Sequence, residues 1–232
     1  MPFYYMMDST YILIIIGLVI SLIAQAYVKR TFSQYSDVRS RNNYTGTEAA
    51  LYILEQAGIH DVSVERVQGD LTDHYDSRNK VLRLSDSTAN SRSVAAIGVA
   101  AHEVGHAIQD HVGYFPLRLR ASLVPVTNIG QRMSMPMILI GLILGSGGNS
   151  LIQLGIILFS LTFVFQVVTL PVEFNASRRA LQILEGGVLQ REEVPQARKV
   201  LNAAALTYVA AAIMSFLQLL RLVMLFGGRR RD

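Results

Sequence analysis

Residues 133–172 read MSMPMILIGLILGSGGNSLIQLGIILFSLTFVFQVVTLPV, and none of these 40 side chains carries a charge. A helix needs about 20 apolar residues to cross the hydrocarbon core of a bilayer, so this stretch is too long for one crossing. Residues 145–150, with the sequence GSGGNS, interrupt it with strong turn formers. The stretch therefore predicts a helical hairpin in the membrane, with one arm over 129–144 and the other over 151–172.

Two more uncharged stretches predict further membrane segments. They cover residues 9–28 and 200–220. The first predicts a membrane anchor, because its basic pair Lys29 and Arg30 follows the apolar core, whereas a cleaved signal peptide has its basic residues in front. Residues 203–226 predict a fourth segment, which either crosses the bilayer or lies in its interface because Gln218 and Arg221 interrupt it.

The composition excludes several classes of protein. Hydrophobic residues make up 51% of the 232-residue chain and charged residues only 16%, which excludes a disordered chain. The chain has no cysteine, so disulfides, thiol chemistry and cysteine-ligated metals are excluded as well. The net charge of +4 is modest, and we expect no nucleic-acid partner.

The distribution of basic residues predicts an orientation, since Lys and Arg are retained on the cytoplasmic side of a membrane. Residues 29–122 contain eleven of them and residues 173–202 contain five, whereas the turn at 145–150 contains none. Both charged blocks are therefore expected in the cytoplasm, and the N-terminus and the hairpin tip outside. The three arginines at 229–231 disagree with a fourth crossing, which would place them outside.

These boundaries predict five segments. They are an N-terminal anchor (1–28), a cytoplasmic domain (29–122), the membrane hairpin (123–172), a second cytoplasmic segment (173–202), and a fourth membrane or interfacial helix with a basic tail (203–232). The fold class is α+β, with a helical bundle of about four crossings and a cytoplasmic domain that carries a small sheet. In that domain we expect a helix that begins at the capping box 45–48, strands near 62–67, 71–76 and 81–84, and a helix over 93–111.

The motif that carries chemistry lies on this last helix. His102-Glu103-Val104-Gly105-His106 matches H-E-x-x-H, in which two histidines four residues apart project from one helix face and can bind one metal ion. Zinc in such a site lowers the pKa of its bound water to around 7. The motif therefore predicts zinc ligands at His102 and His106 and a general base at Glu103. The alternative is a fortuitous His/Glu face on a surface helix.

A catalytic zinc ion needs a third protein ligand. The remaining histidines are His60, His74 and His111. The downstream candidate is Glu173, the first charge after the uncharged stretch, at the point where a membrane helix is expected to return to the cytoplasm. The alternative is an interfacial carboxylate that pairs with Arg178 or Arg179.

Two parts of the chain resemble a known family. Residues 100–109 (AAHEVGHAIQ) and 171–177 (PVEFNAS) are similar to the bacterial YugP-type neutral zinc metallopeptidases, membrane proteins similar in layout to the HtpX membrane proteases. The resemblance covers nearly the whole chain and includes residues 71–76 and 80–85. It implies a gluzincin-like zinc (Zn2+) peptidase domain in the bacterial cytoplasmic membrane.

The resemblance also implies roles for four residues. His102, His106 and Glu173 would be the zinc ligands, and Glu103 the general base. One departure is Asn175, where the family leads us to expect Asp, and this weakens a supporting role for a carboxylate there.

Three other side chains are candidates for supporting the metal ligands or stabilising the transition state. They are His74, Ser177 and Arg178. For His74 the alternative is a polar side chain on a strand, and for Arg178 a basic anchor at the membrane. Residues 80–85 are either an edge strand that captures an extended peptide through backbone hydrogen bonds or a plain structural strand.

These observations favour a membrane-embedded zinc endopeptidase with its active site on the cytoplasmic face. Glu103 would activate a zinc-bound water for attack on a peptide carbonyl. Its partners would be membrane lipid and membrane-associated or misfolded polypeptides. The alternative is a non-proteolytic zinc-binding scaffold or chaperone. A transporter is disfavoured, because the membrane segments hold almost no ionisable residue.

Overall fold

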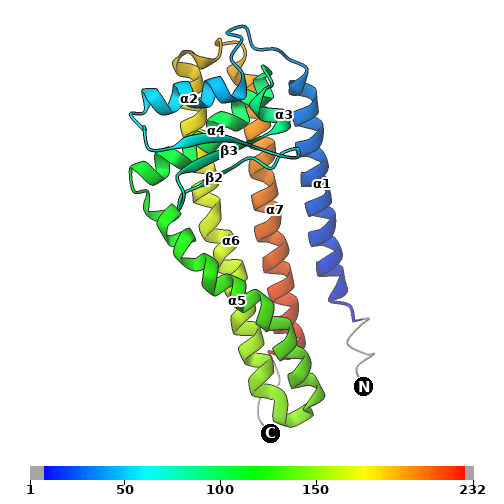
Figure 1. Cartoon of the computed structure of the whole chain (residues 1–232). Coiled ribbons are helices and arrows are strands. Elements are labelled where there is room, and N and C mark those ends of the chain that lie inside the picture. Colours follow the sequence, from blue (N-terminus) through cyan, green and yellow to red (C-terminus); the bar gives the residue numbers. More distant parts are fainter. Residues whose placement is uncertain (1–7, 228–232) are drawn as a thin grey trace. The chain divides into compact units, whose positions relative to one another are not determined.

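The structure is a computed structural model that describes residues 8–227, and it is mostly helical with one small sheet (Figure 1). The helices are α1 (Tyr11–Ser36), α2 (Gly46–Gln56), α3 (Asp86–Ala89), α4 (Val94–His111), α5 (Phe115–Ile143), α6 (Asn149–Ile183) and α7 (Val194–Phe226). The strands are β1 (Ser63–Val67), β2 (His74–Asp76) and β3 (Val81–Ser85). A 3-10 helix (Gly145–Gly148) follows α5, and a π-helix (Leu184–Val188) follows α6. The predicted basic tail at 229–231 lies outside the described residues.

The chain forms two compact units, which we describe separately. The apolar unit comprises residues 8–24, Leu119–Leu170 and 208–227. The site unit comprises Gln25–Arg118 and Pro171–Thr207. Helices α1, α5, α6 and α7 contribute residues to both units.

The apolar unit contains the predicted helical hairpin. Helices α5 and α6 are joined through the 3-10 helix at the predicted turn, so the predicted connection of two helices at residues 145–150 is confirmed. Small residues let the two helices touch: a Cβ atom added to Gly141 of α5 would lie 3.1 Å from the backbone nitrogen of Ile152 of α6, and one added to Gly155 of α6 would lie 2.8 Å from the carbonyl oxygen of Ser134 of α5. Such close backbone approach is typical of packed membrane helices.

Three helical stretches within residues 8–227 are long and apolar enough to cross a membrane: α1, Gly145–Val188 and α7. The expected number was about four, and α5 is the stretch that is missing from this set. After Arg132 only 11 residues of α5 remain, up to Ile143. At 1.5 Å per residue they span about 16 Å, against about 30 Å for the hydrocarbon core.

The site unit contains the sheet, in the strand order β1-β3-β2. Strand β3 pairs in parallel with β1 and antiparallel with β2, and the three strands lie where they were predicted. The suggestion that residues 80–85 form an edge strand is wrong, because β3 is paired on both sides. Local alternation and turn residues predict that strands exist, but the order of pairing depends on the packing of the whole unit.

The two predicted helices of the site unit are confirmed, and both begin at a side-chain cap. The Thr45 hydroxyl accepts a hydrogen bond from the backbone N–H of Glu48 at 3.1 Å, and the Glu48 carboxylate accepts one from the N–H of Thr45 at 2.7 Å. At α4, the Ser93 hydroxyl accepts from the N–H of Ala96 at 3.1 Å. Figure 1 shows α2, α3 and α4 gathered around the sheet.

Helix α4 is the centre of the site unit. Its small and aliphatic residues form a core with α2, β3 and the site-unit parts of α6 and α7, and most of that core is fully buried. The sheet is also tied to the last turn of α4, because the Tyr75 hydroxyl and the Lys80 ammonium donate to the Asp110 carboxylate at 2.9 and 2.7 Å. Burial, and then the hydrogen bond to Asp110, raise the pKa of Tyr75, so its hydroxyl stays a donor. The apolar core and the hydrogen bonds to Asp110 therefore fix the position of α4, the helix that carries the H-E-x-x-H motif.

Candidate metal centre

Three side chains of the site unit bring metal-binding atoms together. Their ligand atoms, from His102 and His106 on α4 and Glu173 on α6, all lie within 4.8 Å of one another. Glu173 Oε2 lies 3.3 Å from His102 Nε2 and 3.5 Å from His106 Nε2. Two ligands at 2.0–2.1 Å from a tetrahedral zinc ion are about 3.4 Å apart. Both the donor types and the His–Glu separations therefore fit zinc.

The motif glycine explains how α4 and α6 come close enough. A Cβ atom added to Gly105 would lie 2.7 Å from the carbonyl oxygen of Ala176, so only glycine fits at this crossing. The facing residues of α6, Val172 and Ala176, are fully buried. Gly105 therefore allows Glu173 to reach the two histidines, although 71 residues separate it from His102 in sequence.

Helix α6 does not end where the sequence suggested. Glu173 was expected just past the end of a membrane helix, but α6 continues to Ile183, and the next break is the π-helix that contains Gly186 and Gly187. A charged residue alone does not stop a helix; the glycine pair does, since Gly187 adopts a φ of +123°. Glu173 is consequently held on a rigid helix and not on a loop.

The centre is buried and carries negative charge. Glu173 is 2% exposed, His106 8% and Glu103 9%. Burial by itself lowers the pKa of His106, but the hydrogen bond that His106 donates to Glu173 and the charges of Glu103 and Glu173 outweigh it, so the pKa is raised. This environment favours a positive charge at the histidines, either a proton or a metal ion.

Glu103, the predicted general base, is not part of the three-residue cluster in residues 8–227. It lies on α4 next to His102, is almost fully buried, and is near enough for its charge to act on His106. The remaining histidines are also outside the cluster of the described residues: His60, His74 and His111.

The structure brings only one of the three predicted supporting residues to a histidine. The Ser177 hydroxyl lies 3.1 Å from His102 Nδ1. Arg178 is exposed and lines a hollow of about 230 Å³ beside Ser177. His74 lies on β2, with Nδ1 2.9 Å from the carbonyl oxygen of Thr72 and Nε2 3.5 Å from Arg83.

The sequence analysis missed Gln109. This side chain is fully buried, and its Oε1 lies 3.0 Å from His106 Nδ1. Its Nε2 donates to the carbonyl oxygen of Val172 at 2.8 Å and to Asn175 Oδ1 at 2.9 Å. A signal was present, because Gln109 comes three residues after His106 and so shares its helix face.

Comparison with known proteins gives two matches. The profile of a family described as "Putative neutral zinc metallopeptidase" matches residues 10–227. The chain is also 49% identical, over 221 residues, to a protein of Bacillus subtilis (strain 168) named "Putative membrane protease YugP". That alignment covers 95% of this chain and 97% of the relative. No solved structure matches the chain.

Proposed function

This chain belongs to the neutral zinc metallopeptidase family, and on that premise we propose that it is a membrane-embedded zinc endopeptidase. The observation that carries the proposal is the buried cluster of His102, His106 and Glu173, whose donor atoms and spacing fit zinc. We propose membrane-associated or misfolded polypeptides as its substrates, because the three apolar helices would hold the enzyme in a bilayer.

Each residue of the cluster has a role in this proposal. His102, His106 and Glu173 would hold zinc, which when bound supplies a Lewis acid and lowers the pKa of water. Glu103 takes the proton of the attacking water while the hydroxide oxygen forms its bond to the peptide carbonyl carbon. Glu103 then delivers that proton to the amine nitrogen as the C–N bond breaks. One water is consumed, and a carboxylic acid and an amine are released, which become a carboxylate and an ammonium at neutral pH.

A zinc-binding scaffold is the less well supported alternative. A structural zinc site is closed by four protein ligands, whereas the cluster in residues 8–227 has three and leaves a position for water or substrate. A scaffold would also have no use for the buried carboxylate of Glu103. We propose the cytoplasmic side for the site, because the two blocks that form it hold sixteen of the 21 basic residues.

Two glutamate variants test the proposal. We expect Glu103→Gln to keep zinc and to lose about 10²–10⁴-fold in cleavage rate, since it removes the base and leaves the ligands. Glu173→Gln replaces a charged ligand with a neutral one, so zinc content itself should fall. The measurements are zinc per purified chain in detergent and cleavage of unfolded casein.

Glu55→Gln on the exposed face of α2 is the matched control, and it should keep both zinc and activity. Wild-type cleavage by Glu103→Gln would refute the mechanism. A full equivalent of tightly bound zinc in Glu173→Gln would place the third ligand elsewhere.

A further inference from the structure

We propose that Gln109 is the positioning residue that presents His106 to the metal, and that Asn175 and Arg179 hold Gln109 in place. The inference builds on the zinc site proposed above and adds three residues to it. They form one chain of hydrogen bonds, from His106 on α4 to Arg179 on α6.

The hydrogen bonds of Gln109 can be assigned without ambiguity. The carbonyl oxygen of Val172 can only accept, so the amide group 2.8 Å from it must be the NH2 of Gln109. The Gln109 Oε1 therefore faces His106 and must accept from it, at 3.0 Å. In its neutral, metal-binding form His106 therefore carries its proton on Nδ1 and keeps the lone pair on Nε2. Nε2 is the atom that faces Glu173, at 3.5 Å.

The second histidine lacks such a constraint. His102 Nδ1 lies 3.1 Å from the Ser177 hydroxyl, which can either donate or accept. Ser177 therefore orients the ring of His102 but leaves its tautomer open, whereas Gln109 sets both for His106. We infer that His106 is the pre-arranged ligand, and that Gln109 therefore matters more for zinc affinity than Ser177 does.

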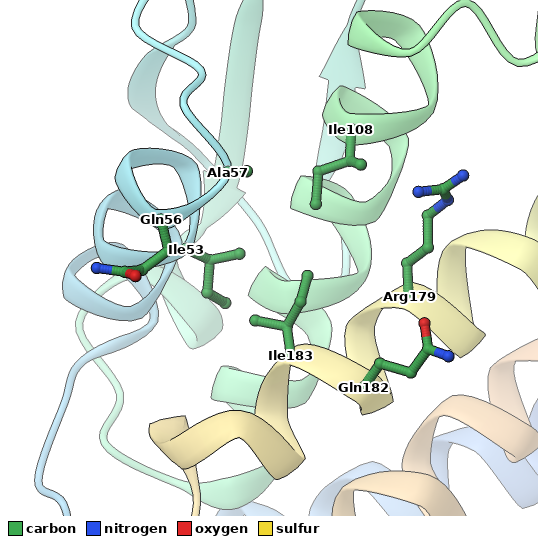
Figure 2. Close-up of a pocket in the computed structure, with 7 residues that line it drawn as sticks. All are labelled: Ile53, Gln56, Ala57, Ile108, Arg179, Gln182 and Ile183. Carbon is green, nitrogen blue, oxygen red and sulfur yellow. The ribbon is translucent and has the colours of Figure 1, made fainter.

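Asn175 and Arg179 complete the chain. Asn175 Oδ1 accepts from Gln109 Nε2 and from Arg179 Nε, each at 2.9 Å. Arg179 reaches the wall of a pocket of about 250 Å³, and Figure 2 shows its side chain extending from α6 alongside Ile108 of α4. Asn175 acts here only as an acceptor. An aspartate at this position would accept the same two hydrogen bonds. The asparagine found here in place of the expected aspartate therefore still provides the acceptor oxygen.

The test measures zinc affinity directly. The full chain is purified in detergent, stripped of metal, and titrated with zinc against a chromophoric chelator; the cobalt(II) absorption spectrum reports the ligand geometry. We expect Gln109→Leu to bind zinc about 10–100-fold more weakly, the range typical for loss of a group that orients a metal-bound histidine. Gln56→Leu is the matched control, because it makes the same change at an exposed position on the wall of the pocket in Figure 2 and should leave affinity unchanged.

Further variants separate positioning from a merely structural role. Asn175→Leu should weaken zinc binding, Asn175→Asp should preserve it, and Ser177→Ala should weaken it less than Gln109→Leu. The melting temperature of the metal-free chain reports structure independently. If Gln109→Leu does not fold, the comparison of zinc affinity between Asn175→Leu and Asn175→Asp tests the inference instead. Wild-type zinc affinity in folded Gln109→Leu, or equal losses in the two Asn175 variants, would overturn the inference. A wild-type chain that binds no zinc would instead refute the proposed zinc site.

Discussion

The two units place apolar side chains very differently. Of the 31 large apolar side chains that are exposed in residues 8–227, 23 lie in the apolar unit and 8 in the site unit. In the site unit the largest aliphatic side chains instead form a buried core around α4. Burial of apolar area is the main driving force of folding in water, so the apolar unit cannot be organised for water. We therefore expect exposed leucines to contact lipid in the apolar unit and water in the site unit.

The units also differ in how they use close helix contacts. In the apolar unit, Gly141 and Gly155 bring the backbones of α5 and α6 together at contacts where no ionisable side chain lies against the glycine. In the site unit, Gly105 brings α4 against Ala176 and thereby places Glu173 at the two histidines. The same device of a small residue at a crossing serves helix packing in one unit and metal-ligand geometry in the other.

The largest effect that we expect is all-or-none labelling across the membrane. The chain has no cysteine, so single cysteines at Ser63, Gln190 and Gly147 can be probed without background. In intact cells an impermeant thiol reagent should label Gly147→Cys and should not label Ser63→Cys or Gln190→Cys, because basic residues are retained inside. All three should label after the membrane is permeabilised. Labelling of Ser63→Cys from outside would reverse the orientation proposed for the site.

A matched pair of leucines tests the contrast between the units. Leu18 and Leu51 are each 50% exposed, but Leu18 lies in the apolar unit and Leu51 on α2 of the site unit. Leu18→Lys should cost about 2.5–3.5 kcal/mol of membrane insertion, because a charge then faces hydrocarbon. Leu51→Lys should change the free energy of unfolding by less than about 0.5 kcal/mol. For both variants, the yield in the membrane fraction measures insertion and the melting temperature in detergent measures stability. Equal effects of Leu18→Lys and Leu51→Lys would contradict the contrast between the apolar unit and the site unit.

Two glycine variants separate the two kinds of helix contact. Gly105→Ala should destabilise the protein by about 1–3 kcal/mol through overpacking against Ala176, and should also weaken zinc binding. Gly155→Ala should destabilise the chain by a similar amount while zinc affinity stays at the wild-type level. Gly186→Ala is the control, because no heavy atom lies within 4 Å of its added Cβ. A loss of zinc in Gly155→Ala would show that the units are coupled.

The smallest effect that we expect is that of pH, and it should arise in the site unit, which holds all five histidines. The pKa of His106 is raised in the folded, metal-free chain. Its contribution to stability is therefore fully present below the unfolded pKa of about 6.5 and is lost as pH rises through the folded pKa. With zinc bound the sign reverses, because protons compete with the metal and zinc stabilises more as pH rises. Unfolding measured between pH 6 and 8, with and without zinc, checks both directions; His106→Ala should remove the metal-free slope.

Much of the local structure was predictable because it depends on neighbouring residues. The capping box at Thr45, the turn after α5, the three strands and the helix that carries His102 and His106 all follow from hydrophobic periodicity and from residues with strong local preferences. The chemistry of the H-E-x-x-H spacing is likewise local, since four residues make one turn of a helix.

What the tertiary structure decided are the contacts between segments that are far apart in sequence. The central position of β3 depends on which strand pairs on its second edge, and the sequence did not predict that α6 continues past Glu173 to Ile183. The sequence suggested Glu173 but left it open between a ligand and an interfacial carboxylate. Only the crossing of α4 and α6 at Gly105 brings it to the histidines, and the same crossing creates the link from His106 through Gln109 to Asn175. Short-range preferences cannot specify such contacts, because they form only when packing of the whole unit sets the distance between two helices.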